Sequence, residues 1–250
     1  MAVVLLTKRI EFAASHRYHR PEWSDAKNRA TFGAWNNEPG HGHNYMLEVT
    51  VAGDVDQRTG MVVNLFDLKQ VLLQVLEEFD HKHLNLDLPY FARQIPTSEN
   101  LARVLWDKLD AQRDIGTLRR ICLYEDEDLC ADLTAEAGLE VGSVTRRYSF
   151  TAVHEGQRGH TWDLFVTVHG RIDADTGMVT DIVALDRLVQ ERVVTAFEGK
   201  DLRSVLATSP VTGEYMAKTI WDRLASRIPA GTLQGVKLVQ TRDLFYEYTG

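Results

Sequence analysis

The chain has 250 residues and a net charge of −8, with 28 lysines and arginines against 36 aspartates and glutamates. This length is enough for one large domain or for two of ordinary size. The acidic balance argues against a nucleic-acid-binding surface, and no apolar run is long enough to predict a membrane-spanning helix.

The first half of the chain predicts strands followed by helices. Residues 3–16 alternate in polarity and predict a long strand, and residues 43–55 predict a second. Residues 64–79 carry an apolar stripe at helical spacing, and the asparagine that opens them can cap a helix. Thr97 is a typical cap for a further helix, and residues 118–125 return as a strand. Helices on one face of an antiparallel sheet give an α+β fold.

The N-terminal residues and the two cysteines indicate the cellular compartment. The N-terminal residues MAVVLLTKRIEF lack the basic lead and the cleavage site of a signal peptide. The two cysteines, Cys122 and Cys130, are typical of a reducing compartment rather than of a disulfide scaffold. We therefore expect a soluble cytoplasmic protein.

The chain repeats itself. Residues 43–62 and 160–179 align without a gap and are identical at eleven of twenty positions. The match extends to residues 9–16 with 147–154, and to residues 101–109 with 216–224. A period of this length is a domain rather than a solenoid unit.

We therefore expect two tandem domains, each an antiparallel sheet with two helices on one face. The boundaries that the repeat predicts are a first domain over residues 1–130, a linker over 131–143 and a second domain over 144–250.

Two histidines two positions apart, His41 and His43, lead into the second strand. Side chains two apart on a strand point to the same face, so both imidazoles can aim at one point. His16, at the end of the preceding strand, could supply a third ligand, and three ligands plus an open position are typical of catalytic zinc. A structural or surface pair of histidines has the same spacing, so the pattern alone leaves both interpretations open.

Two other polar groups have both a functional and a structural interpretation. Asp80 beside His81 is an arrangement for acid–base catalysis, but cations also decorate helix C-termini. Glu125 ends an apolar strand and could accept two N–H bonds from a ring such as a pterin, or it could be a solvated strand end.

The motifs of the first copy together resemble the 6-pyruvoyl-tetrahydropterin synthase and 6-carboxy-tetrahydropterin synthase family. The motifs that carry the resemblance are Phe12-Ala13-Ala14-Ser15-His16, Asn36-Asn37, His41-Gly42-His43-Asn44-Tyr45, Thr59-Gly60-Met61-Val62, Asp80-His81-Lys82-His83-Leu84-Asn85, Pro96-Thr97-Ser98-Glu99-Asn100 and Tyr124-Glu125. They cover almost all of residues 3–126.

The resemblance implies a fold, a cofactor and a site. The fold is the tunnelling fold, in which subunits join their sheets around a channel, so a homo-oligomer with active sites at subunit or domain interfaces is expected. The resemblance implies Zn²⁺ on His16, His41 and His43, a pterin held by Glu125 with Thr97 and Ser98, and proton transfer by Asp80 and His81.

One position departs from the family pattern. The family's catalytic cysteine precedes the HGH motif, and Trp35 stands at its place here. Glu38, three residues before His41, resembles the glutamate of a cysteine-free branch that cleaves the pterin side chain. A glutamate near zinc could act as a base, although a glutamate in such a loop is also often merely exposed.

The second copy has lost most of these residues. His154 and His160 match His16 and His43, but Arg158 matches His41. Glu198-Gly199 replaces Asp80-His81 and Gln240 replaces Glu125, so we expect this copy to keep its fold and to lack a working site. We hypothesise that Arg158 adds positive charge toward substrate phosphates of a neighbouring site; charge reversal that left the Michaelis constant unchanged would count against it.

Three functions follow from the resemblance. The first is a zinc-dependent lyase that acts on 7,8-dihydroneopterin or its triphosphate, with Glu38 replacing the cysteine and 6-hydroxymethyl-dihydropterin as product. The second is a 6-pyruvoyl- or 6-carboxy-tetrahydropterin synthase of the biopterin or queuosine type. The third is a non-catalytic protein that binds pterin or serves as a scaffold, which Trp35 favours.

Overall fold

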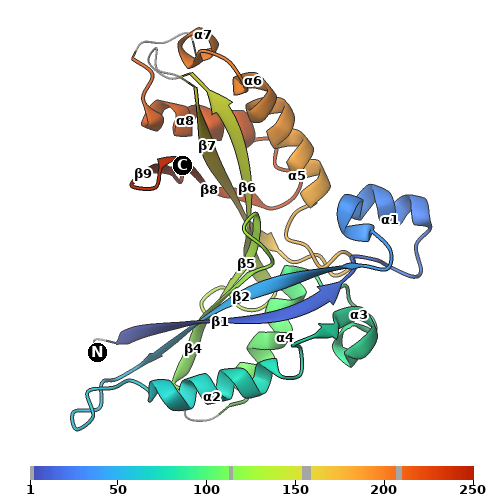
Figure 1. Cartoon of the computed structure of the whole chain (residues 1–250), viewed down its shortest axis with the longest axis vertical. Coiled ribbons are helices and arrows are strands. Elements are labelled where there is room, and N and C mark those ends of the chain that lie inside the picture. Colours follow the sequence, from blue (N-terminus) through green and yellow to red (C-terminus); the bar gives the residue numbers. More distant parts are fainter. Residues whose placement is uncertain (1–2, 113–114, 154–158, 207–209) are drawn as a thin grey trace. The chain divides into compact units, whose positions relative to one another are not determined.

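The computed structural model describes residues 3–112, 115–153, 159–206 and 210–250, and its chain trace is shown in Figure 1. The chain forms two compact units: Met1–Gly142 with Arg171–Met178, and Ser143–Gly170 with Val179–Gly250. The stretch predicted as a linker, residues 131–143, contains most of one strand and the beginning of the next.

The first unit is built on a sheet in the order β3-β1-β2-β4-β5. Neighbouring strands are antiparallel, except that the two-residue β3 runs parallel to β1. The strands are β1 (Val4–His16), β2 (His41–Gly53), β3 (Lys82–His83), β4 (Thr117–Tyr124) and β5 (Leu129–Thr134).

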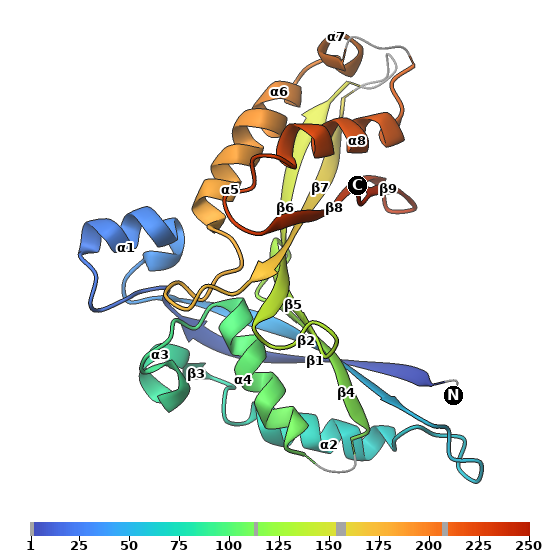
Figure 2. The same ribbon diagram turned by 180° about the vertical axis from the view of Figure 1, so that it is seen from behind.

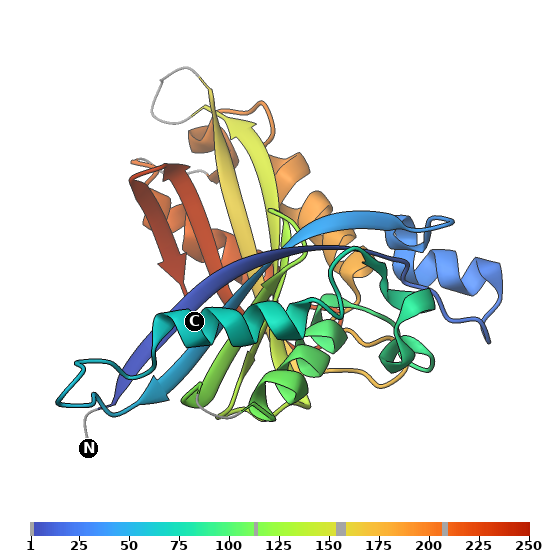
Figure 3. The ribbon, with the colours of Figure 1, turned by 60° about the horizontal axis from the view of Figure 1, so that its bottom comes forward.

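Two long helices of the first unit pack on one face of this sheet, as Figure 3 shows. They are α2 (Leu65–Leu76) and α4 (Ser98–Asp110), and the shorter helical segments are α1 (Asp25–Phe32), η1 (Gly33–Asn36), α3 (Leu84–Asp87) and η2 (Pro89–Phe91). Fully buried side chains such as Leu47, Leu72 and Leu105 fill the space between the layers. The predicted caps are confirmed, because Asn64 accepts from Phe66 N at 2.9 Å and Thr97 accepts from Asn100 N at 3.2 Å.

The second unit repeats this plan. Its sheet order is β6-β7-β8-β9, and its strands are β6 (Val141–Ala152), β7 (His160–Arg171), β8 (Thr232–Thr241) and β9 (Leu244–Tyr248). Its helices are α5 (Ile182–Val189), the π-helical turn η3 (Gln190–Val194), α6 (Thr195–Phe197), α7 (Leu202–Leu206) and α8 (Gly213–Leu224). The α+β class and the tandem arrangement predicted from the sequence are thus confirmed. None of the described helices is long and apolar enough to cross a membrane.

Candidate metal centre and active site

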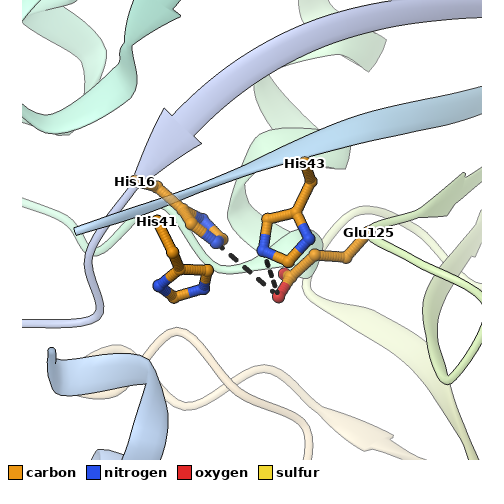
Figure 4. Close-up of side chains that lie close together, drawn as sticks. All are labelled: His16, His41, His43 and Glu125. Carbon is orange, nitrogen blue, oxygen red and sulfur yellow. Dashed lines mark ion pairs between the residues drawn. The ribbon is translucent and has the colours of Figure 1, made fainter.

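The register of β1 and β2 brings the three histidines together. His16 lies directly opposite His41, and Ala14 lies opposite His43. Directly opposite residues of an antiparallel pair share a face, and so do residues two apart. All three rings therefore point into one space, with ring centroids 4.8–5.0 Å apart, as Figure 4 shows.

Neighbouring oxygens orient two of the three rings. His16 Nδ1 lies 2.9 Å from Pro96 O, and His41 Nδ1 lies 2.7 Å from Asn37 Oδ1. Because a carbonyl oxygen can only accept, each Nδ1 carries a proton, and Nε2 is the nitrogen left to bind a metal ion. Asn37 Nδ2 donates to Gly40 O at 3.2 Å, which sets the orientation of that amide. The third ring, His43, has a buried Nε2 without a hydrogen-bond partner in the described part of the chain.

Glu125 joins the histidines from β4. Met46 pairs with Tyr124, so the next residue, Glu125, comes opposite Tyr45 on the face of His43. Its Oε1 lies 3.6 Å from His16 Nε2 and 3.5 Å from His43 Nε2. The carboxylate is fully buried.

Three donors hold this buried carboxylate. The Tyr18 hydroxyl donates at 2.8 Å and Ser98 Oγ at 2.7 Å to Oε2, while Trp35 Nε1 donates at 3.1 Å to Oε1. Burial alone would raise the pKa of Glu125, but His16, His43 and Ser98 bring it down to about 2. Glu125 is therefore an anion at physiological pH.

The four side chains suit a metal ion. The ligand atoms of His16, His41, His43 and Glu125 all lie within 4.8 Å of one another. Burial, with the neighbouring His16 and His43, lowers the pKa of His41 to about 4, and burial also lowers the pKa of His43. Zinc takes neutral imidazole nitrogens and carboxylate oxygens. Three imidazole nitrogens and a carboxylate oxygen this close together form a donor set that fits a bound cation.

Asp80 and His81 lie beside this cluster but are not part of it. His81 Nδ1 is 2.8 Å from Asp80 Oδ2, and the ring is 80% exposed. Asp80 Oδ1 accepts from Ala13 N at 2.8 Å, which lowers the pKa of Asp80. His81 and His43 both line an open pocket of about 570 Å³. His81 has a φ of 59°, a conformation that costs a non-glycine residue energy and that often marks a functional position.

The other predicted site residues have different surroundings. Thr97 is buried, caps α4 and donates to Gly177 O at 2.7 Å, whereas Ser98 bonds Glu125. Glu38 is 82% exposed, and its nearest ionic partner is Arg17 at 3.6 Å. It lines a cavity of about 360 Å³ that the three ligand histidines do not line.

Sequence reasoning missed two supporting residues. Tyr18 stacks on Trp35 and bonds Glu125, and Asn37 orients His41. Asn37 had a signal in the sequence, because it belongs to the Asn36-Asn37 motif just before the histidines. Nothing in the sequence indicated Tyr18.

The second copy keeps the backbone of the site without its chemistry. Thr151 N donates to Glu198 Oε2 at 2.9 Å, as Ala13 N does to Asp80, and Gly199 has the φ of 68° that matches His81. Gln240 Oε1 accepts from the Tyr246 hydroxyl at 2.9 Å. Among the described residues the first copy alone has a metal-binding cluster. His154 and Arg158 lie outside the described residues.

Comparisons with known proteins show the same tandem arrangement. A family model described as 6-pyruvoyl tetrahydropterin synthase matches residues 5–136 and again 145–250. The human 6-pyruvoyl tetrahydrobiopterin synthase is 44% identical over 124 residues, which cover 49% of this chain and 86% of the relative. A putative 6-carboxy-5,6,7,8-tetrahydropterin synthase of Archaeoglobus fulgidus is 38% identical over 93 residues, 37% of this chain and 74% of that relative.

A solved structure also matches about half of the chain. The 6-pyruvoyl tetrahydropterin synthase of Caenorhabditis elegans superposes with a TM-score of 0.52 and 35% identity, covering 54% of this chain and 97% of that one. One whole relative therefore corresponds to about half of this chain.

Proposed function

The chain belongs to the 6-pyruvoyl tetrahydropterin synthase family, and from this membership we propose that its first unit is a zinc-dependent lyase acting on the side chain of 7,8-dihydroneopterin or its triphosphate. One observation carries the proposal. Two imidazole Nε2 atoms, of His16 and His43, converge on Oε1 of the buried Glu125 at 3.5–3.6 Å. The names of the relatives support a pterin as substrate.

In this proposal His16, His41 and His43 hold the zinc ion. When bound, zinc would supply Lewis-acid polarisation of a side-chain oxygen of the substrate. Glu125 would anchor the N–H groups of the pterin ring, because a buried anion is a strong acceptor for two donors. Ser98 and Tyr18 hold that carboxylate in place, while Thr97 fixes the helix start from which Ser98 projects.

Asp80 and His81 would move protons. Asp80 holds the Nδ1 side of the His81 ring, which leaves Nε2 to exchange a proton with the substrate. Glu38 is the candidate for the task that a cysteine performs in relatives. Its exposed carboxylate and the exposed ring of His81 suit a site completed by another subunit, which the family resemblance predicts.

The proposed reaction breaks the carbon–carbon bond between the first and the second side-chain carbons. A base takes the proton of the hydroxyl on the second side-chain carbon. That carbon becomes the aldehyde carbon of the fragment that leaves. An acid then protonates the first carbon to give 6-hydroxymethyl-dihydropterin.

Product identification by mass spectrometry tests this reaction. Zinc-loaded protein is incubated with 7,8-dihydroneopterin and, separately, with its triphosphate. We expect 6-hydroxymethyl-dihydropterin and at least a hundredfold slower turnover for Glu38→Gln and for His81→Ala, the scale of general acid–base catalysis. Full turnover by Glu38→Gln would remove Glu38 from the mechanism, and a 6-pyruvoyl or 6-carboxy product would assign the synthase reaction instead.

A second candidate, a pterin-binding protein without catalysis, is favoured by one contact. Trp35 Nε1 donates to the same Glu125 oxygen that faces the histidines. Binding of zinc and pterin without conversion of either dihydroneopterin form would establish this candidate over the lyase.

A further inference from the structure

The chain contains two copies of one loop in the same conformation. The first loop, residues 54–62, and the second loop, residues 171–179, share the pattern Asp-x-x-Thr-Gly-Met-Val. Gly60 N donates to Asp56 O and Gly177 N to Asp173 O, both at 2.8 Å. The aspartate side chain accepts from the threonine hydroxyl in each, at 3.1 and 3.0 Å. The two loops can therefore form the same contacts.

The second loop is docked within the first unit, where Figure 2 shows it at the start of α4. It contacts Arg20, Thr97 and Asn100, which we call the α4 site. Thr97 Oγ1 donates to Gly177 O at 2.7 Å, and Arg20 Nε donates to Asp175 O at 2.7 Å. A Cβ on Gly177 would come within 2.3 Å of Asn100 Nδ2, so the fit is close.

The first loop lacks such a site in the described part of the chain. A Cβ on Gly60 would meet nothing within 4 Å. Met61 is 47% exposed, while the matching Met178 is 3% exposed. Val55 is 45% exposed where Ile172 is 3% exposed, and Phe66 beside the loop is 68% exposed. Val55, Met61 and Phe66 thus leave apolar surface exposed at the first loop and beside it.

The second unit presents an uncovered counterpart of the helical part of the α4 site; Arg20 lies in a stretch, residues 17–40, that the second copy largely lacks. Thr212, Glu214 and Tyr215 at the start of α8, the α8 site, align with Thr97, Glu99 and Asn100. Thr212 accepts from Tyr215 N at 3.2 Å, the same capping bond that Thr97 makes. The three residues of the α8 site are exposed, whereas Thr97, Glu99 and Asn100 are at most 4% exposed.

Arg58 of the free loop and Glu214 of the free site are opposite in charge. In the docked loop Asp175 pairs with Arg20 at 3.0 Å. The matching position of the first loop is Arg58, and the α8 site carries Glu214. We propose that the first loop of one chain docks on the α8 site of a second copy of the chain. The two surfaces differ, so the contact is heterologous and builds either a closed ring or an open chain of copies.

Sedimentation velocity of the full chain tests this contact, using Arg58→Glu, Glu214→Arg, the double variant and Met61→Glu. Arg29→Glu is the control, an equal charge change on the exposed face of α1. We expect the wild type and the control to form the same oligomer. Each single variant should weaken association about tenfold or more through like charges or a buried carboxylate, and the double variant should restore it.

The mutated side chains are exposed, so circular dichroism should show the wild-type spectrum for every variant. A monomeric wild type, an unchanged oligomer in Arg58→Glu and Met61→Glu, or a double variant as weak as the singles would each overturn the proposal.

Discussion

At the scale of single residues, Asn37 determines which nitrogen of His41 faces the cluster. Its amide oxygen accepts from Nδ1, which leaves Nε2 free for a metal ion. Such outer partners typically contribute 10- to 100-fold to metal affinity.

We predict that Asn37→Ala weakens zinc binding by about 10- to 100-fold in competition with a chromophoric chelator. Asn37→Asp keeps an acceptor for the ring and should stay near the wild-type affinity. Equal affinity of Asn37→Ala and the wild type would show that His41 needs no orienting partner.

Trp35 contacts Glu125 through its indole N–H. A carboxylate offers about four lone-pair positions, and Tyr18, Ser98 and Trp35 already use three. A pterin ring bound at Glu125 as proposed needs two acceptors and would therefore compete with the indole N–H.

We predict that Trp35→Phe, which keeps a ring and removes the donor, tightens pterin binding about tenfold, since a hydrogen bond to a charged group contributes about 1.5–3 kcal/mol. Fluorescence titration with a pterin product measures this. Weaker binding by Trp35→Phe would mean that the indole positions the carboxylate for the ligand.

At the scale of elements, the strands and helices with clear periodicity could be predicted. The strand predicted over residues 3–16 is β1, the helix predicted over 64–79 contains α2, and Thr97 begins α4. The short helix α1 could not be predicted, because most of its side chains are exposed and it carries no apolar stripe. Most of the strand β5 falls within a stretch, residues 131–143, whose small and acidic residues looked like a linker.

The place of Glu125 beside the histidines depends on a long-range register. The pairing of β2 with β4 shifts between Thr50 and Val51. A bulge of this kind changes which residues face each other, and local sequence does not reveal it. The sequence therefore indicated that Glu125 could bind the pterin ring, but not how far Glu125 lies from His16 and His43.

The docked second loop gives a prediction for α4. Gly177 and Gly60 have φ values of 74° and 71°, so alanine strains both backbones equally. Gly177→Ala also drives a methyl group into Asn100, whose amide donates to Ile95 O at 2.9 Å.

We predict that Gly177→Ala lowers the free energy of unfolding by about 1–3 kcal/mol more than Gly60→Ala, as overpacking typically costs. Urea denaturation at low protein concentration, where copies of the chain are separated, measures the difference. Equal losses would show that the second loop is not held closely against α4.

At the scale of the whole molecule, the two copies differ in the features that they retain. The first retains a cluster of side chains suited to a metal ion, and the second retains the strands, the caps and a loop, Arg171–Met178, that belongs to the first unit. The sequence predicted this division because the ligand positions changed in the second copy while the Thr-Gly-Met-Val motif and apolar pattern survived.

The central claim is that zinc in the first copy, and there alone, supports pterin conversion. Its most direct test measures zinc per chain and turnover of dihydroneopterin together, in the wild type, in His43→Ala and in His160→Ala, the matched histidine of the second copy. We predict one zinc per chain and full turnover in the wild type and in His160→Ala, and neither in His43→Ala. Zinc and turnover that survive His43→Ala, or that disappear in His160→Ala, would contradict the account.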